Sequence, residues 1–410
     1  MASWLFRTVV SSGMRIVSIG DIGPLDGMLH VGDEAMFEAM VIELRSRGAS
    51  HITGLSSNLV DSADRYGIDA IQNLGFGDLG KDRAASEQRM HDILTGRIQP
   101  RDPAVAVVHA VQTADLVVIA GGGNMTSIWP SHIFERATLG ALAKAAGVPL
   151  VVSGQTLGPQ LDEPDSVLLA GLLRSADLVG VREGDSLALA AGLGIEAQLH
   201  ADDASFLADL APSSAPLPPF PYCLVTLSTH TGPAEREEFV AAAALLLDRV
   251  AASTGLGVVF SGHFAPFGGA PRGDEVIHEL VRSAMEQQSG TARAQSAAES
   301  AALARGASLV VSSRYHPVVF AVSGGVPAVG IPVDDYTTTK LTGALGNFGQ
   351  SSVLPLNALL AEDGPSLVND VWLDRSGIRE TGLQRAHEQR AASSAWWDAV
   401  AALGVSVQTS

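Results

Sequence analysis

The chain has 410 residues, a net charge of −18 and a hydrophobic fraction of 46%. Its length accommodates two domains of ordinary size, and its composition favours a buried core over disorder. The negative charge argues against nucleic acid or an anionic membrane as the main partner, so an anionic substrate would need a local basic pocket.

The single cysteine, Cys223, excludes an internal disulfide and a cysteine zinc site, and it fits a reducing cytoplasm. No apolar run is long enough for an integral membrane segment. Residues 1–13 lack the long apolar region and the cleavage site of a secretory signal, so we interpret them as an N-terminal extension. We expect a cytoplasmic protein, acting in solution or at the inner face of the membrane.

The first half of the chain alternates short apolar runs with helical patterns. Residues 15–20 predict a buried strand, and residues 35–47 have the apolar spacing of a helix. Asp33 and Glu34 stand where the first turn of a helix favours acidic residues. Either helix capping or a role at a binding site would explain them, because this loop is expected at a sheet edge where ligands usually bind.

Three segments share one pattern, in which a short apolar run follows a helical stretch and ends in a loop rich in Gly, Ser or charge. They are residues 114–117, 176–179 and 307–310. Repeated α–β units of this kind collect their loops at the carboxyl edge of a parallel sheet. The pattern therefore predicts an α/β fold.

The first of these loops, residues 121–126, contains Gly122, Gly123 and Asn124. Glycines after a strand allow a ligand to approach the backbone, although a plain tight turn would explain them equally well. The spacing differs from the dinucleotide-binding fingerprint. The second loop places Arg182 just beyond a strand, where it either pairs with Glu183 or binds a ligand.

Residues 211–221 are rich in proline and serine and predict a linker. We therefore expect an N-terminal α/β domain over residues 14–210 and a second α/β domain over residues 222–360. C-terminal helices follow over residues 361–410. In the second domain, residues 257–261 predict a strand that ends close to His263.

The most informative stretch is residues 309–331. A short buried strand leads to Ser312 and Ser313, which we expect to cap a helix, and Gly324 ends that helix. Arg314 and His316 stand two residues apart, so they would project to the same side of an extended loop, beside free N–H groups that suit an anion. Alternatively, Arg314 pairs with a carboxylate and His316 is a core histidine. The convergence of both side chains on a helix start favours an anion site.

These segments together resemble the polysaccharide pyruvyl transferases, whose architecture is similar to that of the GT-B glycosyltransferases. The resemblance covers roughly residues 15–345. It rests on Gly32–Glu34, Asp115–Gly123, Gly154–Pro159, Val181–Ser186, Ala201–Phe206, Ser313–His316, Gly324–Pro327 and Lys340. It implies two Rossmann-like domains with parallel sheets facing a central cleft, with the acceptor on the N-terminal side and the donor on the C-terminal side.

The resemblance implies transfer of an enolpyruvyl unit from phosphoenolpyruvate to a sugar or lipid-linked oligosaccharide, forming a pyruvyl ketal and releasing phosphate. Arg314 and His316 match the donor-site Arg and His of the family and are our candidates for catalysis. Phosphoenolpyruvate carries two anionic groups and so needs at least two cationic clamps, which makes a metal or cofactor unnecessary. The candidate substrate-binding residues are Arg182, Lys340, His263, Ser313, Gly122, Gly123, Asn124, Asp33 and Glu34, and the base would be Asp33, Glu34 or another carboxylate of the first domain.

One departure and two alternatives stand beside this interpretation. Residues 21–30 lack the Asn-rich glycine pattern expected there, which leaves the acceptor undefined. A glycosyltransferase of the same architecture would hold a nucleotide-sugar diphosphate on the same cations, with Asp334 or Asp335 on the ribose. A non-catalytic sugar-binding or regulatory protein is the other alternative. The chain has no coiled-coil heptads that would indicate its oligomeric state, and a homo-oligomer is one possibility.

Overall fold

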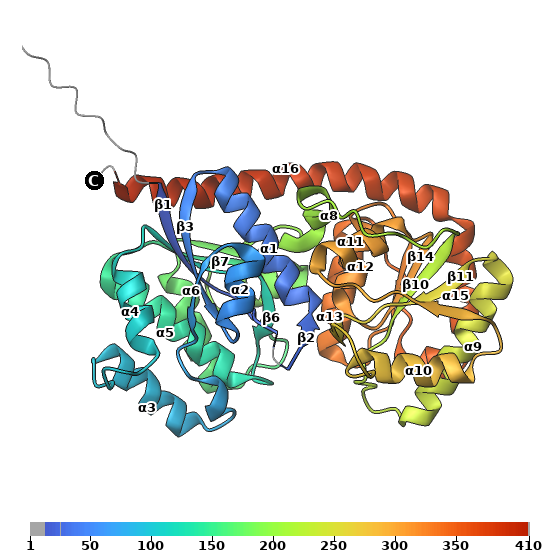
Figure 1. Ribbon diagram of the computed structural model, residues 1–410, viewed down its shortest axis with the longest axis horizontal. Helices are drawn as coiled ribbons and strands as arrows, with labels where there is room; N and C mark the ends of the chain where they lie inside the picture. Colours follow the sequence, from blue (N-terminus) through green and yellow to red (C-terminus); the bar gives the residue numbers. More distant parts are fainter. Residues whose placement is uncertain (1–12, 25, 409–410) are drawn as a thin grey trace, which may run out of the picture.

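The structure is a computed structural model that describes residues 13–24 and 26–408 (Figure 1). The predicted N-terminal extension lies outside these residues, apart from Gly13. Two α/β domains lie next to each other, each built on a parallel sheet with helices on its faces. This arrangement confirms the predicted fold class. In the described part of the chain, no helix is both long and apolar enough to cross a membrane.

The sheet of the first domain has eight strands among the described residues, and its strands run parallel. Its central strands are apolar on both faces because helices cover both sides. The sheet order is β4 (Asp69–Gln72), β3 (Ala49–Ser56), β1 (Met14–Ile19), β5 (Leu116–Ile119), β7 (Leu150–Leu157), β8 (Leu178–Val181) and β9 (Gln198–Leu199), with β6 (Gly122–Met125) also paired to β7.

The helices of the first domain are α1 (Val31–Ser46), α2 (Leu59–Tyr66), α3 (Arg83–Leu94), α4 (Ala104–Gln112), α5 (Pro130–Ala146), α6 (Glu163–Ser175), α7 (Gly184–Gly192) and α8 (Leu207–Leu210). Two 3₁₀ turns, Gly77–Leu79 and Asp203–Phe206, complete it. The predicted linker at residues 211–221 has no helix or strand, because its prolines cannot donate to either.

The sheet of the second domain is parallel as well. Its order is β13 (Ser289–Thr291), β11 (Gly257–Phe260), β10 (Tyr222–Thr226), β14 (Leu309–Ser312) and β15 (Ala328–Gly330). The helices around it are α9 (Arg236–Thr254), α10 (Asp274–Ala284), α11 (Ala297–Gly306), α12 (Tyr315–Val322), α13 (Asp335–Asn347), α14 (Leu356–Leu360) and α15 (Gly364–Leu373).

The two domains are joined by an antiparallel pair of short strands, β2 (Met28–His30) and β12 (Phe264–Pro266). Immediately after β2, the Val31 N–H donates to the His263 carbonyl at 2.9 Å. One apolar cluster also combines residues of β2 and α1 with buried side chains of α11 and α12. The loop before α1 therefore crosses to the second domain instead of staying on its own sheet.

The last helix, α16 (Arg375–Gln408), runs along one side of both domains (Figure 1). Its first half lies against the second domain, where Gln389 donates to the Asn347 carbonyl. Its second half returns to the first domain and buries Trp396 and Trp397 under the sheet. The predicted C-terminal helices thus bridge the two domains.

Three local predictions need correction. α1 begins at Val31, four residues before the predicted start at Ala35, and its N-cap is His30, so Asp33 does not cap it, while Asp33 and Glu34 lie in the first turn as expected. Residues 122–125 form β6 instead of a loop, because they pair with β7. The N-cap of α12 is Arg314, and it is not Ser312 or Ser313, because Ser312 still belongs to β14.

Candidate active site

A pocket of about 520 Å³ lies between the two domains at the carboxyl edges of both sheets. The elements that reach it are the loop after β1, the start of α1, β6, the start of α5, the end of β8, α12 and α13. The predicted site residues that line it are Asp33, Glu34, Gly123, Asn124, Arg182, Arg314, His316 and Lys340.

A larger hollow, of about 750 Å³, lies beside the Pro-rich linker. Of its two charged side chains, Arg293 pairs with Glu275 at 2.6 Å and Glu299 accepts from the Gln295 N–H at 2.8 Å. Because these charges are already satisfied, we place the chemistry in the interdomain pocket.

Arg182 is fully buried directly after β8 and is held from two sides. Its Nε donates to the Thr156 hydroxyl at 2.9 Å and its Nη1 donates to Asp202 at 2.6 Å. Its guanidinium also lies over the Tyr315 ring, 4.5 Å from the ring centroid. The remaining nitrogen, Nη2, has no hydrogen-bond partner among the described residues although it is buried. Since such a donor is costly to leave unpaired, it indicates a ligand position.

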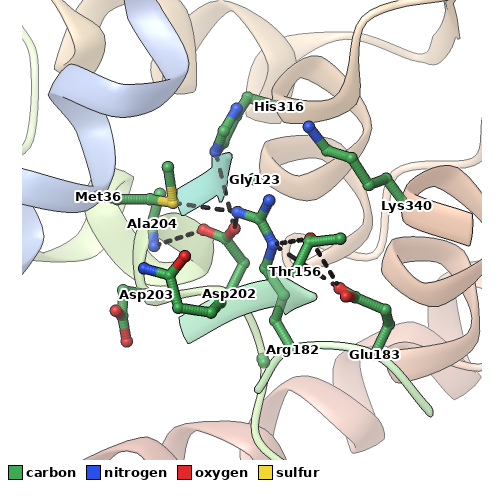
Figure 2. Close-up of polar contacts among 12 residues, drawn as sticks. Met36, Gly123, Thr156, Arg182, Glu183, Asp202, Asp203, Ala204, His316 and Lys340 are labelled. Carbon is green, nitrogen blue, oxygen red and sulfur yellow. Dashed lines mark hydrogen bonds and ion pairs between the residues drawn. The ribbon is translucent and has the colours of Figure 1, made fainter. Parts of the chain in front are cut away.

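His316 approaches the same place from the first turn of α12. Its Nε2 lies 3.7 Å from Asp202 Oδ2, too far for a hydrogen bond, and is buried without a hydrogen-bond partner in the described structure. Its Nδ1 side packs against Gly32, where a Cβ would clash. Burial alone would raise the pKa of Asp202, but Arg182 and His316 outweigh burial and hold this pKa below its ordinary value. Figure 2 shows Arg182, Asp202 and His316 pointing toward one another.

Lys340 extends from α13 toward the same point (Figure 2). Its amine donates to the Tyr336 hydroxyl at 3.0 Å, and that hydroxyl donates to the Gly123 carbonyl at 2.5 Å. A Cβ on Gly123 would lie 2.9 Å from Lys340 Nζ and 3.0 Å from Arg182 Nη2. The missing side chain of Gly123 thus leaves a space that two cations face, each from a different domain.

Arg314 was expected either to pair with a carboxylate or to bind an anion, and its position fits both. It forms a bidentate pair with the fully buried Asp274, at 3.1 Å from Nε and 2.5 Å from Nη2. Asp274 is itself fixed by the N–H groups of His263 and Phe264. About a third of the Arg314 side chain is still exposed, at the pocket wall. Arg314 therefore adds positive charge, while its strongest contact is structural.

Three predicted binding residues lie outside the pocket lining. The Ser313 hydroxyl accepts the Ser228 N–H at 2.8 Å, which ties two loops of the second sheet together. His263 is buried behind the site, 5.9 Å from the Phe320 ring, and burial, with His316 and Arg314, lowers its pKa. Gly122 belongs to β6 and faces Gln155. All three shape the wall without reaching the cavity.

The opposite wall of the pocket is acidic and comes from the first domain. Burial and the neighbouring Asp21 raise the pKa of Asp33, although His30, His316 and Lys340 oppose them. Burial also raises the pKa of Glu34 to about 8, against Arg65 and the Gly23 N–H. The Glu34 carboxylate accepts from the Gly23 N–H at 3.0 Å and lies 4.0 Å from Arg65 Nε.

Several residues were not predicted as part of the site: Asp21, Trp129 and Tyr336 of the pocket lining, and Asp202, which pairs with Arg182 behind it. Asp202 lies inside the segment 201–206 that carried part of the resemblance, and Tyr336 stands one helical turn before Lys340, so the sequence held a signal for both. Asp21 and Trp129 gave no signal, because only the folded chain brings the end of β1 next to the start of α5.

Residues 30–335 match the family model described as polysaccharide pyruvyl transferase. No curated protein matches the chain. The solved structures of similar fold include UDP-GlcNAc 2-epimerase from Neisseria meningitidis bound to UDP-GlcNAc, at 10% identity and a TM-score of 0.57, covering 93% of this chain and 99% of that one.

Another is MnaA from S. aureus with UDP, at 12% identity and a TM-score of 0.57, with 87% and 88% of the two chains covered. The glycosyltransferase SnogD from Streptomyces nogalater has 17% identity and a TM-score of 0.52, with 96% and 99% covered. At these identities the likeness concerns the GT-B fold and not the substrate.

Proposed function

The chain belongs to the polysaccharide pyruvyl transferase family, and we propose that it transfers the enolpyruvyl unit of phosphoenolpyruvate to a sugar of a cell-surface polysaccharide or its precursor. The donor is a cytoplasmic metabolite, so we place the reaction in the cytoplasm. One observation carries the proposal beyond the family: Arg182 Nη2, which has no hydrogen-bond partner in the described structure, and Lys340 Nζ both face the small space beside Gly123. His316, whose Nε2 is also without a hydrogen-bond partner there, lines the same pocket.

These groups suit the two anionic ends of phosphoenolpyruvate. A guanidinium and an ammonium make charge-assisted hydrogen bonds to carboxylate and phosphate oxygens, and such bonds are about twice as strong as neutral ones. The two cations come from different domains, so one donor molecule would be held across the cleft. Arg314, a third exposed, adds to the positive potential at the same wall.

The reaction needs an acid and a base. A proton joins the methylene carbon C3 of the donor while a sugar hydroxyl adds to C2; the bond between C2 and the phosphate oxygen then breaks, and a second hydroxyl closes the ketal. Of the two hydroxyl protons, one is balanced by the new C–H bond and the other leaves with phosphate. We assign the acid to His316 and the base to Asp33, because both side chains line the pocket and the charges of His316 and Lys340 oppose the rise in the pKa of Asp33.

The nucleotide-sugar alternative finds less support in the site. Asp334, which would hold a ribose, caps α13 through Thr337 at 2.7 Å and pairs with His230 at 2.8 Å. Its carboxylate is therefore already engaged. The fold likeness to glycosyltransferases bears on architecture alone.

The test is donor binding to wild type and two lysine variants, measured by calorimetric titration. Lys340→Ala should weaken phosphoenolpyruvate binding by about tenfold or more, since a hydrogen bond to a charged group contributes roughly 1.5–3 kcal/mol. Lys144→Ala is the matched control, because Lys144 is exposed on α5. The proposal would be contradicted if Lys340→Ala bound phosphoenolpyruvate as tightly as wild type. It would also be contradicted if wild type bound UDP-sugars and did not bind phosphoenolpyruvate.

A further inference from the structure

The acidic wall contains an aromatic side chain that the proposed donor chemistry does not use. Trp129 stands immediately before α5, is 41% exposed and lines the pocket. Its ring contacts Tyr336 edge to face, with 5.6 Å between the centroids. Tyr336 in turn bonds Lys340 and Gly123, so the indole lies one side chain away from the donor position. An exposed indole inside a polar pocket is an apolar platform beside the reacting groups.

Asp21 is fixed next to this platform. Its carboxylate accepts from Arg136 Nη2 at 2.9 Å and from the Asn124 amide, and His132 Nδ1 lies 3.4 Å away. Burial alone would raise the pKa of Asp21, but Arg136 and His132 outweigh burial and hold it well below its ordinary value. An ionised carboxylate has about four lone-pair sites, so at least one is left for a ligand donor. Asp21 is thus an oriented acceptor for a hydroxyl group.

We propose that the acceptor is an uncharged pyranose that stacks on the Trp129 indole and donates a hydrogen bond to Asp21. This inference rests on the proposed pyruvyl transfer and names the acceptor class for the same pocket. Sugar C–H bonds carry a slight positive charge and are attracted to the negative face of an aromatic ring. The ring would then present its hydroxyls between Asp33 and the donor.

The charges of the pocket argue against an acidic sugar. Arg182, Arg314 and Arg136 are already paired with Asp202, Asp274 and Asp21, and Lys340 faces the space beside Gly123 that we assign to the donor. A uronate at Trp129 would instead lie beside Asp21 and Asp33. The carboxylate of the uronate would be repelled by these two carboxylates, and the repulsion would be stronger in the partly buried pocket than in water. The pocket would therefore bind a neutral sugar more tightly than a uronate.

The size of the pocket is consistent with two ligands. Its volume of about 520 Å³ falls within the range of roughly 300–1,000 Å³ that is usual for drug-sized molecules. Phosphoenolpyruvate is a three-carbon acid phosphate and fills only part of that space. The remaining part borders Trp129, Asp21 and His132.

The experiment measures phosphate release with phosphoenolpyruvate and a panel of methyl pyranosides of glucose, galactose and mannose, together with the methyl uronides of glucose and galactose. We expect a neutral pyranoside to be pyruvylated in preference to the uronides. Trp129→Ala should raise the KM for that sugar by about tenfold and leave the KM for phosphoenolpyruvate unchanged. Trp129→Phe should raise the KM for the sugar less than Trp129→Ala does. Asp21→Asn should reduce the preference for the neutral pyranoside over the uronides.

The control is Phe220→Ala, which removes a similarly exposed aromatic ring outside this pocket. Three outcomes would overturn the inference and leave the donor assignment standing. The protein could use uronides as well as neutral sugars, or Trp129→Ala could leave the KM for the sugar unchanged. The third outcome is a protein that binds phosphoenolpyruvate but uses no neutral pyranoside. Failure to bind phosphoenolpyruvate would overturn both.

Discussion

Gly123 has no side chain, and this leaves open the space that we propose for the donor. Any Cβ there would lie 2.5 Å from the Tyr336 hydroxyl, 2.9 Å from Lys340 Nζ and 3.0 Å from Arg182 Nη2. The residue is therefore needed for the space itself and not for an unusual backbone angle.

We expect Gly123→Ala to abolish measurable donor binding while the protein still folds. The added methyl group occupies the space where an anion would meet Lys340 and Arg182, and Lys340 is a flexible side chain that can move aside. Thermal unfolding with and without phosphoenolpyruvate measures this, because a bound ligand raises the melting temperature.

Gly171→Ala is the matched control, since Gly171 lies exposed inside α6 with no atom near its Cβ position. That change should stabilise the protein by about 1 kcal/mol or less through helix propensity. A Gly123→Ala protein that gains as much stability from phosphoenolpyruvate as wild type would contradict our placement of the donor.

At the scale of elements, α16 connects the two domains, because its C-terminal half buries two aromatic rings against the first domain. Trp397 is 1% exposed under the first sheet, and Trp396 Nε1 donates to the Ser153 hydroxyl at 3.0 Å. Near these rings, Asp398 pairs with Arg47 at 2.7 Å. The helix is thus anchored on the domain opposite to the one that precedes it in sequence.

Trp397→Ala should lower the free energy of unfolding by about 3–5 kcal/mol, because deleting a buried indole loses both transfer free energy and packing. Urea titration followed by circular dichroism measures the change. Val405→Ala, on the same helix and 50% exposed, should change stability by less than about 0.5 kcal/mol. Similar small losses in both variants would show that the end of α16 does not hold the domains together.

At the scale of the whole molecule, the two domains share a core. Leu29, Val31 and Met36 of the first domain belong to the same buried cluster as Ala301 and Val318 of the second. The β2–β12 pair and α16 add two further connections. Domains joined through a large apolar interface are not expected to move or unfold independently.

We therefore expect a single calorimetric unfolding transition for the full chain, with the calorimetric and van't Hoff enthalpies in agreement. Two resolved transitions would contradict a shared core. Phosphoenolpyruvate should shift that one transition as a whole, because its proposed ligands Arg182 and Lys340 come from both domains.

Much of this organisation follows from the sequence alone. The apolar runs and the glycine- and serine-rich loops after them predict parallel sheets, and the order of the motifs indicates the family. Because carboxyl ends of parallel strands meet at one edge, the positions of Arg182 and Gly123 after their strands predict that these two lie close together. His316 follows a strand of the second sheet, and it joins them because the resemblance implies two sheets that face one cleft. These features are local in the chain, or they follow from a general rule of topology.

The tertiary structure decided the partners of those residues. No pattern in the sequence shows that Arg314 would be paired with Asp274, forty residues away, or that Asp21 and Trp129 would form the wall opposite Lys340. Such contacts join segments that are distant in the chain, and each depends on the packing of the elements between them. The meeting of Arg182, Gly123 and His316 in one pocket was therefore predictable from sequence, whereas the surroundings of Asp21 and Trp129 depend on how the elements of the first domain pack on one another and against α13.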